Sequence, residues 1–192
     1  MPVVLNGERV RLEPLSLDHL DDLVRVGLDL AIWELTIARP TDRAGIETWL
    51  RGSLDNAAAG VDVPFATIDV ASGRAVGSTR FMSIVPDHRR LEIGWTWLGT
   101  QFQRSGLNRE AKYLQLTHAF ESLGANRVEF KTDARNDRSR AALLGIGATF
   151  EGIFRRHMIM PTGPLRDSAF YSVIAEDWPA VKAHLASALG RG

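Results

Sequence analysis

The sequence predicts an α+β domain, in which helices flank one mixed sheet. Segments with the two-residue period of a half-buried strand alternate with segments of helical period, in the order β-α-α-β-β-β-α-β-α-β-β-α. The chain has 192 residues, of which 45% are hydrophobic, so it can bury a substantial core. No Pro/Gly/Ser-rich or low-complexity stretch could act as a linker, which predicts a single domain over residues 1–192.

The first 60 residues contain one predicted strand and two predicted helices. Charged and apolar residues alternate from Arg9 to Leu15, as in a half-buried strand. Ser16 can cap a helix in which leucine and valine recur at helical spacing as far as Leu28. A second helix is expected over residues 43–59, because Thr41 or Asp42 can cap its start.

Three strands should follow, over residues 65–70, 75–85 and 89–98. The sequence ASGR at 71–74 predicts the hairpin turn between the first two. In the third strand, alternation places two sets of side chains on opposite faces. One face should carry Leu91, Ile93, Trp95 and Trp97, and the other Glu92, Gly94, Thr96 and Leu98.

The second half of the chain alternates helices and strands again. A long helix is expected over 107–123, where Tyr113, Leu116 and Phe120 recur with helical spacing. A strand over 126–134 precedes a short helix that Asn136 can cap. The remaining predicted elements are strands over 149–160 and 166–175, joined by the turn MPTGPL, and a final helix after Asp177.

Composition narrows the function classes. The net charge is zero, which argues against a nucleic-acid binder that depends on excess Lys and Arg. Residues 1–62 carry 11 acids against 6 arginines, a net of −5, so the remainder carries +5. This asymmetry is compatible with two ligands of opposite sign or with plain solvated faces. No cysteine is present, which excludes disulfides, Cys-rich zinc sites and a cysteine acyl-enzyme.

The chain has no sequence feature of export or membrane insertion. Its start, MPVVLNGERVRL, lacks the basic residues and apolar run of a signal peptide. No stretch approaches the ~20 apolar residues that cross a bilayer. The five histidines have no metal-ligand spacing. We therefore expect a soluble cytoplasmic protein that binds no metal and has no membrane partner.

The loop before the helix at 107 is a candidate anion site. Backbone N–H groups that converge at a helix start favour negative charge, as does the helix dipole. Residues 103–108, QRSGLN, offer such a turn, with Arg104 and Arg109 as nearby cations. Ordinary turn chemistry explains such a glycine equally well, and neither G-x-x-x-x-G-K-[ST] nor G-x-G-x-x-G is present.

In combination, these motifs resemble the GNAT acetyltransferase superfamily. The pattern is strand 91–98, then Gln103-x-x-Gly106-x-Asn108 opening a helix, then Asn136-Asp-Arg-Ser139 after the next strand. The segments VRLEPL, EIGWTWL, GLNREAKYL, KTDARNDRS and RDSAFYSVIAEDW resemble its ribosomal-protein N-acetyltransferase (RimJ/RimL-type) branch. The resemblance spans nearly the whole chain.

The resemblance implies a three-layer fold whose mostly antiparallel sheet is splayed at its middle and holds acetyl-CoA. Strands 91–98 and 128–133 would diverge in a V shape and hold the cofactor between them. The backbone near Trp97 and Leu98 would pair with the pantetheine, and Asn136 would bind the same arm. The pyrophosphate would lie on the loop residues Gln103, Arg104, Ser105, Gly106, Leu107 and Asn108, with Ser139 adjoining the cofactor. Asn108 departs from the family pattern, which has a second small residue there.

Acyl transfer to an amine needs a base, an oxyanion donor and a proton for the departing thiolate. With no cysteine in the chain, direct attack within a ternary complex is the simplest scheme. Glu92 is the candidate base, because a carboxylate on an apolar strand face should have a raised pKa. The alternative is a structural glutamate paired with an arginine. By family analogy, the backbone N–H near Leu98 is the expected oxyanion donor.

The acid is harder to assign. Many family members have a tyrosine at the position of Leu143, whereas Tyr113 and Tyr171 have the pattern of core residues. Ser139 is the remaining candidate, although it could simply complete the cap with Asn136.

The expected acceptor pocket contains Trp33, Glu92 and Trp95, with Trp33 either a pocket wall or a core residue. The acceptor amine would be attracted to the acidic N-terminal third. Protein N-termini, polyamines, amino acids and aminoglycosides all suit such a pocket. A catalytically weak CoA-binding or sensor module is the alternative function, and a non-CoA binding domain of similar topology is a third. Oligomeric state stays open, a homodimer included.

Overall fold

The structure is a computed structural model that describes residues 3–160 and 163–191. Its strands form one sheet in the order β1-β2-β3-β4-β5-β6-β8-β7. All neighbouring strands are antiparallel except β5 and β6. The strands are β1 (Leu5–Asn6), β2 (Val10–Pro14), β3 (Val63–Asp69), β4 (Arg74–Val85), β5 (Arg90–Leu98), β6 (Arg127–Asp133), β7 (Thr149–Ile159) and β8 (Leu165–Ile174).

In the described part of the chain, five α-helices flank the sheet, and both helices predicted in the N-terminal part are present. The helices are α1 (Leu20–Gly27), α2 (Arg43–Ala58), α3 (Leu107–Thr117), α4 (Asp137–Gly145) and α5 (Trp178–Ala188). Asp42 caps α2 by accepting a hydrogen bond from the backbone of Gly45 at 2.8 Å. A π-helical segment, His118–Ser122, continues α3. The mixed sheet and the predicted element order are confirmed, with β1 as an added short strand.

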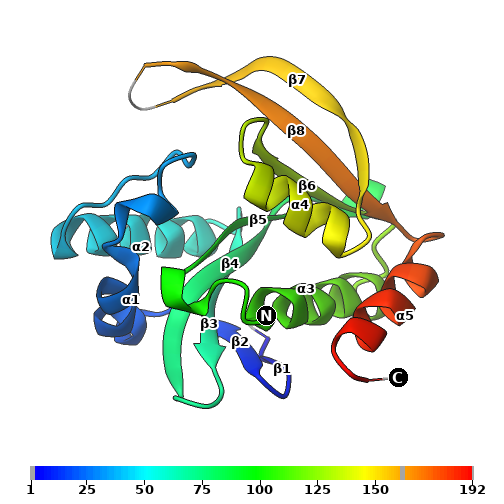
Figure 1. Cartoon of the computed structure of the whole chain (residues 1–192), viewed down its shortest axis with the longest axis horizontal. Coiled ribbons are helices and arrows are strands. Elements are labelled where there is room, and N and C mark those ends of the chain that lie inside the picture. Colours follow the sequence, from blue (N-terminus) through cyan, green and yellow to red (C-terminus); the bar gives the residue numbers. More distant parts are fainter. Residues whose placement is uncertain (1–2, 161–162, 192) are drawn as a thin grey trace.

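The sheet has a separate hydrophobic core on each face. One core joins α3, α4 and α5 to the sheet through residues such as Leu116, Leu143 and Leu185. The other joins α1 and α2 to the opposite face through Leu23 and Leu50. Figure 1 shows these two helical layers, with the β7–β8 hairpin arching beyond them. The resulting three-layer arrangement is the one that the resemblance implied.

The centre of the sheet opens between β5 and β6. These strands pair in parallel only from Arg90↔Arg127 to Glu92↔Glu129. Beyond Glu92, β5 continues to Leu98 without pairing to β6, so the two strands diverge. The loop that follows β5 leads to the start of α3, and α4 begins just after β6. The splayed strands therefore bring both helix starts to the same opening.

The predicted alternation along β5 is wrong after Gly94. Trp95 has a left-handed backbone (φ 49°), and the pairing with β4 shifts between Ser78 and Arg80. This β-bulge reverses the faces of the residues that follow. Consequently Leu98 joins Leu91 and Ile93 in the α3-side core. Trp97, predicted to lie with Leu91, packs in the α1–α2 core instead.

The turn MPTGPL joins β7 and β8, but its Pro161 and Thr162 lie outside the described residues. Over residues 3–160 and 163–191, no helix is both long and apolar enough to cross a membrane.

Candidate active site

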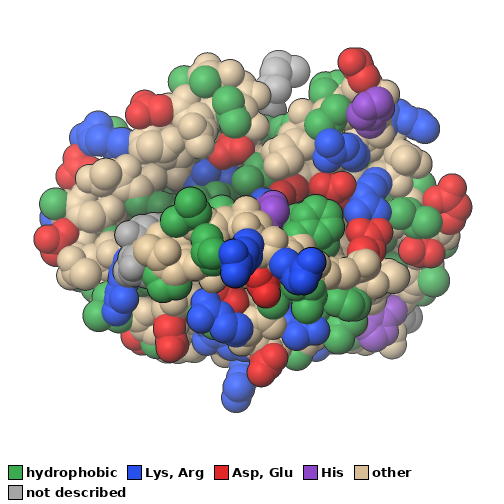
Figure 2. Space-filling view, turned by 90° about the horizontal axis from the view of Figure 1, so that it is seen from above, with side chains coloured by type: hydrophobic (Ala, Val, Ile, Leu, Met, Phe, Trp, Pro, Cys, Tyr) green, Lys and Arg blue, Asp and Glu red, His purple; other side chains and the backbone are tan. Residues whose placement is uncertain are grey.

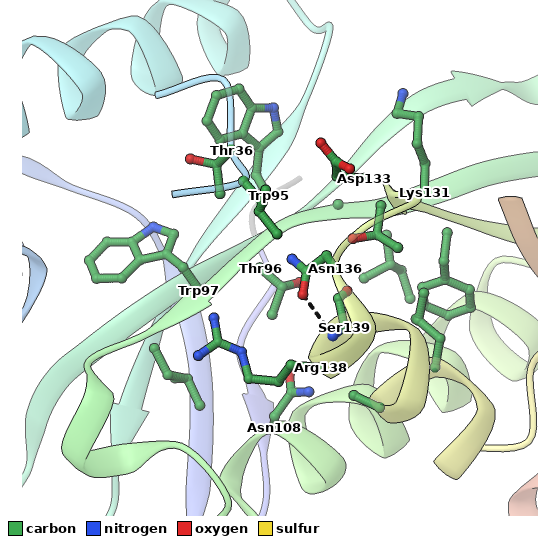
Figure 3. A pocket seen from close by; sticks show the side chains of 18 of the residues that line it. Thr36, Trp95, Thr96, Trp97, Asn108, Lys131, Asp133, Asn136, Arg138 and Ser139 are labelled. Atoms are coloured by element: carbon green, nitrogen blue, oxygen red, sulfur yellow. Dashed lines mark hydrogen bonds between the residues drawn. The ribbon is translucent and has the colours of Figure 1, made fainter. Parts of the chain in front are cut away.

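A groove of about 850 Å³ lies where β5 and β6 diverge. Its walls come from β5, the loop before α3, the start of α4, and the segment before α2 (Figure 3). Figure 2, viewed from above the β7–β8 hairpin, shows a hollow in which charged side chains of both signs are visible. Both predicted catalytic residues, Glu92 and Ser139, line the groove.

The loop before α3 forms one end of the groove. Arg104 (φ 59°) and Gly106 (φ 90°) both have left-handed backbones, and Gly106 immediately precedes the first residue of α3. A side chain at Gly106 would approach an Arg9 guanidinium nitrogen to 2.8 Å. The cations Arg104, Arg109 and Arg138 also line this end. The loop thus combines a helix N-terminus with several cations, as an anion site requires.

The predicted loop residues do not all face the groove. Gln103, Arg104, Gly106 and Asn108 line it. The Asn108 side-chain oxygen is buried without a hydrogen-bond partner among the described residues. The two loop positions outside the lining are Ser105, whose hydroxyl donates to the Phe102 carbonyl at 2.6 Å, and Leu107, which is buried in the α3-side core.

Gln103 links the two sides of the groove. Its side-chain nitrogen donates to the carbonyl oxygen of Leu98 at 3.0 Å, and its oxygen accepts from Arg138 at 2.7 Å. Leu98 ends β5, whereas Arg138 lies in the first turn of α4. In this state the glutamine therefore occupies a backbone acceptor that the resemblance assigns to the pantetheine.

Aromatic side chains cover the α1–α2 side of the groove. Trp33 is almost fully buried and donates its indole hydrogen to the carbonyl of Gly27 at 2.6 Å. Its ring lies 5.0 Å from that of Trp97 and 6.3 Å from that of Trp49. Trp33 and Trp97 both line the groove. Trp33 is therefore a core residue whose edge also forms groove wall, which joins the two predicted alternatives.

Trp95 projects from the bulge of β5. Its ring lies 4.9 Å from the guanidinium carbon of Arg80, which is buried and ion-paired with Asp62 at 2.9 Å. In Figure 3, Trp95 and Thr36 stand on one side of the groove, across from Lys131 and Asp133.

Glu92 is buried, but its carboxylate has polar neighbours, contrary to the expected apolar surroundings. The Lys131 ammonium lies 3.2 Å from its Oε2 atom, and the Ser83 hydroxyl lies 3.4 Å from the same oxygen. Parallel pairing of β5 with β6 puts Glu92 on the sheet face that also carries Lys131. The partner is a lysine from the next strand rather than an arginine.

Asn136 and Ser139 form the N-terminal cap of α4. The Asn136 side-chain oxygen accepts from the backbone nitrogen of Ser139 at 3.0 Å (Figure 3). The cap does not use the Ser139 hydroxyl, which is half-buried at the groove. Tyr171 is buried in the α3-side core, and Tyr113 packs against the same core. Neither tyrosine lines the groove.

A comparison with protein-family models decides the family. Residues 9–149 match the model described as an acetyltransferase (GNAT) domain. The chain belongs to the GNAT acetyltransferase family. GNAT proteins generally carry out acetyl-CoA-dependent N-acetylation.

Similar proteins support the same placement. A putative acetyltransferase from T. thermophilus is 38% identical, with a TM-score of 0.90 over 98% of each chain. The Bacillus subtilis (strain 168) protein named "putative ribosomal N-acetyltransferase YdaF" is 33% identical over 50% of this chain and supports the RimJ/RimL-type branch. Mycobacterium smegmatis RimJ, solved with CoA-disulfide, has the same fold at 24% identity, with a TM-score of 0.79 over 100% of this chain and 94% of that one.

The match to curated relatives is partial. The aligned region spans 51% of YdaF and 55% of a second Bacillus subtilis protein. The sequence resemblance to the GNAT family is nevertheless confirmed, because the family model covers most of this chain.

The buried Lys112 of this GNAT groove was not identified from sequence patterns. Lys112, on α3, lines the groove and donates to Thr96, Gln115 and Thr79 at 2.7, 2.9 and 3.0 Å. Burial lowers the pKa of Lys112 to about 7. Its place among apolar helix positions, with Gln115 three residues on, was the only available signal.

The charge of the groove also differs from the expectation. Six cations and three acids line it: Arg104, Arg109, Lys112, Lys131, Arg138 and Arg166, against Glu92, Asp133 and Asp137. The acidic N-terminal third contributes only uncharged residues to this lining, between Ile32 and Ile37. The groove is therefore basic, and its three acids come from β5, β6 and the first residue of α4.

Proposed function

We propose that this chain transfers an acetyl group from acetyl-CoA to a primary amine, either a protein N-terminus or a small amine. The observation that carries the proposal is the groove between the diverging strands β5 and β6 in a GNAT fold. A cationic loop lies at one end, and Glu92 lies where the strands part. The name of YdaF makes a ribosomal-protein N-terminus the first acceptor to test.

The residues present fit acetyl-CoA. The amides of the 103–108 loop and the start of α3 would hold the pyrophosphate, with Arg104, Arg109 and Arg138 as counter-charges. The edge of β5 near Trp97 and Leu98 has no pairing to β6 and would offer backbone groups to the pantetheine amides. Gln103 would have to release the Leu98 carbonyl when that pairing forms.

Glu92 would act as the base. Acetyl-CoA supplies an activated thioester, and the acceptor must reach it as a neutral amine. The Glu92 carboxylate would take the ammonium proton of the acceptor, directly or through water, while Lys131 holds the carboxylate in place at 3.2 Å. Because the chain contains no cysteine, the amine would attack directly in a ternary complex.

Ser139 would donate a hydrogen bond to the departing sulfur. Its hydroxyl is at the groove and is not used by the α4 cap. The backbone N–H near Leu98 would stabilise the oxyanion. The proposal also includes residence in the cytoplasm. It treats residues 1–192 as a single domain, because one sheet contains strands from Leu5 to Ile174.

A CoA-binding module with weak or no catalysis is the second candidate. It is favoured by Leu143, a buried residue at the position where many family members have a tyrosine. Such a module would keep the phosphate-binding loop and lose turnover.

Thiol release from acetyl-CoA, measured over a panel of amines and N-terminal peptides, separates the two candidates. The enzyme proposal predicts amine-dependent thiol release with an acetylated product of equal amount. Calorimetric binding of acetyl-CoA with no turnover on any member of the panel would favour the module. If acetyl-CoA shows no binding heat at all, both candidates are wrong.

A further inference from the structure

Arg166 is a buried guanidinium that faces the groove. It is the second residue of β8, is only 7% exposed, and contributes to the groove lining. Over residues 3–160 and 163–191 its guanidinium group forms no hydrogen bond and no ion pair, and its Nε atom is buried without a partner. Buried guanidinium groups normally have an anionic partner, because desolvation of an unpaired charge is costly.

The register of the sheet puts Arg166 on the same face as Glu92. Asp133 on β6 pairs with Ser168 on β8, and Ser168 is two residues after Arg166. Glu92 on β5 pairs with Glu129 on β6, and Glu129 is two residues before Lys131. Since side chains alternate along each strand, Glu92, Lys131, Asp133 and Arg166 all project from one face. This face is opposite to the one that packs against α3.

The other charges on this face are already paired. Lys131 contacts Glu92 at 3.2 Å, and Arg135 contacts Asp133 at 2.8 Å. Burial lowers the pKa of Arg166, while Asp133 and Glu92 oppose that effect from outside ion-pair distance. Arg135 is a further cation that acts on Arg166, and His157 faces the same region from β7 through Ser168. Arg166 is therefore the surplus cation of this part of the groove.

We propose that Arg166 binds a carboxylate of the acceptor, so that the substrate class is an amine with a carboxylate a few bonds away. This inference rests on the proposed function. A planar guanidinium matches a carboxylate with two parallel hydrogen bonds. The amine would face Glu92 and the carboxylate would face Arg166, with the apolar side chains of Met82, Trp95 and Met158 lining the same groove.

Two sources have this chemistry: a free amino acid, and a peptide whose first residue is Asp or Glu. The phosphates of CoA do not compete for this position in the proposal. Arg138 reaches the 103–108 loop by donating to Gln103 at 2.7 Å, whereas the charges that act on Arg166 include Asp133 and Glu92.

Matched acceptor pairs test the inference. The free amino acid pair is L-leucine and L-leucinamide, and the peptide pair is Asp-Ala-amide and Asn-Ala-amide. We expect the carboxylate member of one pair to have a kcat/KM at least ~10-fold higher. For leucine this preference would oppose intrinsic reactivity, since leucinamide has the less basic amine. Equal or higher kcat/KM for the amides in both pairs would overturn the inference.

Arg166 variants identify the residue responsible. Arg166→Gln should raise KM for the preferred carboxylate by ~10-fold or more and leave its amide unchanged, and Arg166→Lys should recover part of the preference. Arg155→Gln, an exposed arginine of neighbouring β7, is the matched control. A KM increase of the same size for both members of a pair, or weaker acetyl-CoA binding, would contradict the assignment.

Binding without turnover separates this inference from the proposed function. Calorimetry measures affinity of the four acceptors for the protein saturated with CoA, in wild type and Arg166→Gln. If no amine supports thiol release but the carboxylates bind through Arg166, only the enzyme proposal fails. If thiol release occurs and the carboxylates bind no better than the amides, only the Arg166 inference fails.

Discussion

The Lys131 ammonium lies 3.2 Å from the Glu92 carboxylate, although the two residues come from different strands on the open side of the sheet. Parallel pairing of β5 and β6 ends at Glu92, so this ion pair stands where the groove begins. Lys131 therefore fixes the carboxylate that would receive the acceptor proton. The proposed acetyl transfer depends on this ion pair and on the 103–108 loop, which would bind acetyl-CoA.

Glu110 should stabilise the contact between α3 and the N-terminal strands more than any other polar side chain there. Its buried carboxylate accepts three backbone hydrogen bonds, from Glu8, Arg9 and Val10 at 2.8–2.9 Å, and contacts the Arg191 guanidinium. Glu110→Ala leaves these donors unpaired, so we expect a loss of about 3–5 kcal/mol in the free energy of unfolding. Urea unfolding measures it.

Glu8→Ala is the matched control for that experiment. The Glu8 carboxylate also contacts Arg191, but its side chain is 73% exposed. Its removal should cost less than about 1 kcal/mol. Similar losses for the two variants would show that the buried carboxylate has no special role.

Lys112 should make stability depend on pH. The pKa of Lys112 is about 7 in the folded protein and 10.5 ordinarily, so between these values the unfolded chain binds a proton that the folded chain lacks. The free energy of unfolding therefore rises with pH across that window, by about 1.4 kcal/mol per pH unit. Below about pH 7 the buried lysine destabilises the fold by its full amount.

The variant Lys112→Met removes this penalty. Its unfolding free energy, relative to wild type, should be most favourable near about pH 7 and decline toward about pH 9. Lys182→Met is the control, because Lys182 is paired with Glu121 near the surface and its pKa is raised. A stability difference for Lys112→Met that stays constant with pH would contradict the lowered pKa of the buried Lys112 amine.

Gly106 should be needed for the shape of the anion loop. Its φ of 90° is strained for any residue with a Cβ atom. Gly106→Ala should lower the unfolding free energy by about 1–2 kcal/mol and weaken acetyl-CoA binding several-fold, as measured by calorimetry. Gly52→Ala, in an open helical position of α2, should instead stabilise by about 0.5–1 kcal/mol. Unchanged acetyl-CoA affinity in Gly106→Ala would argue against the loop as the phosphate site.

Substitutions at Ser139 and Asn136 should distinguish a catalytic role from a helix-capping role. Ser139→Ala keeps the backbone nitrogen that Asn136 binds, so stability should not change. Loss of one hydrogen bond to the departing sulfur should lower kcat about three- to tenfold. Asn136→Ala should lose about 1 kcal/mol of stability with the cap. A wild-type kcat in Ser139→Ala would remove the serine from the mechanism.

Periodicity and capping residues predicted most of the fold. Each predicted strand and helix is present within a few residues, because apolar spacing and caps such as Asp42 are local signals. The β5 bulge was not predictable in this way. A single left-handed residue, Trp95, reverses the strand faces, and no glycine at position 95 marks it.

The candidate site was predictable where it lies on one stretch of chain. The 103–108 loop and the Asn136 cap follow from turn and capping residues. The neighbours of Glu92 and Arg166 depend on which strands adjoin in the sheet, and Lys131 reaches Glu92 from 39 residues away. Arg166 was not singled out from the sequence, because the absence of an anion beside it depends on the pairing of β8 with its neighbours.

The most direct test of the proposed catalytic centre is kcat for Glu92→Gln beside its register partner, Glu129→Gln. Glu129 pairs with Glu92 in the sheet but lies outside the groove lining and contacts Arg127. We predict that Glu92→Gln loses ~10²-fold or more in kcat with an unchanged Kd for acetyl-CoA, whereas Glu129→Gln retains wild-type kcat. A wild-type kcat in Glu92→Gln would contradict the assignment of Glu92 as the base.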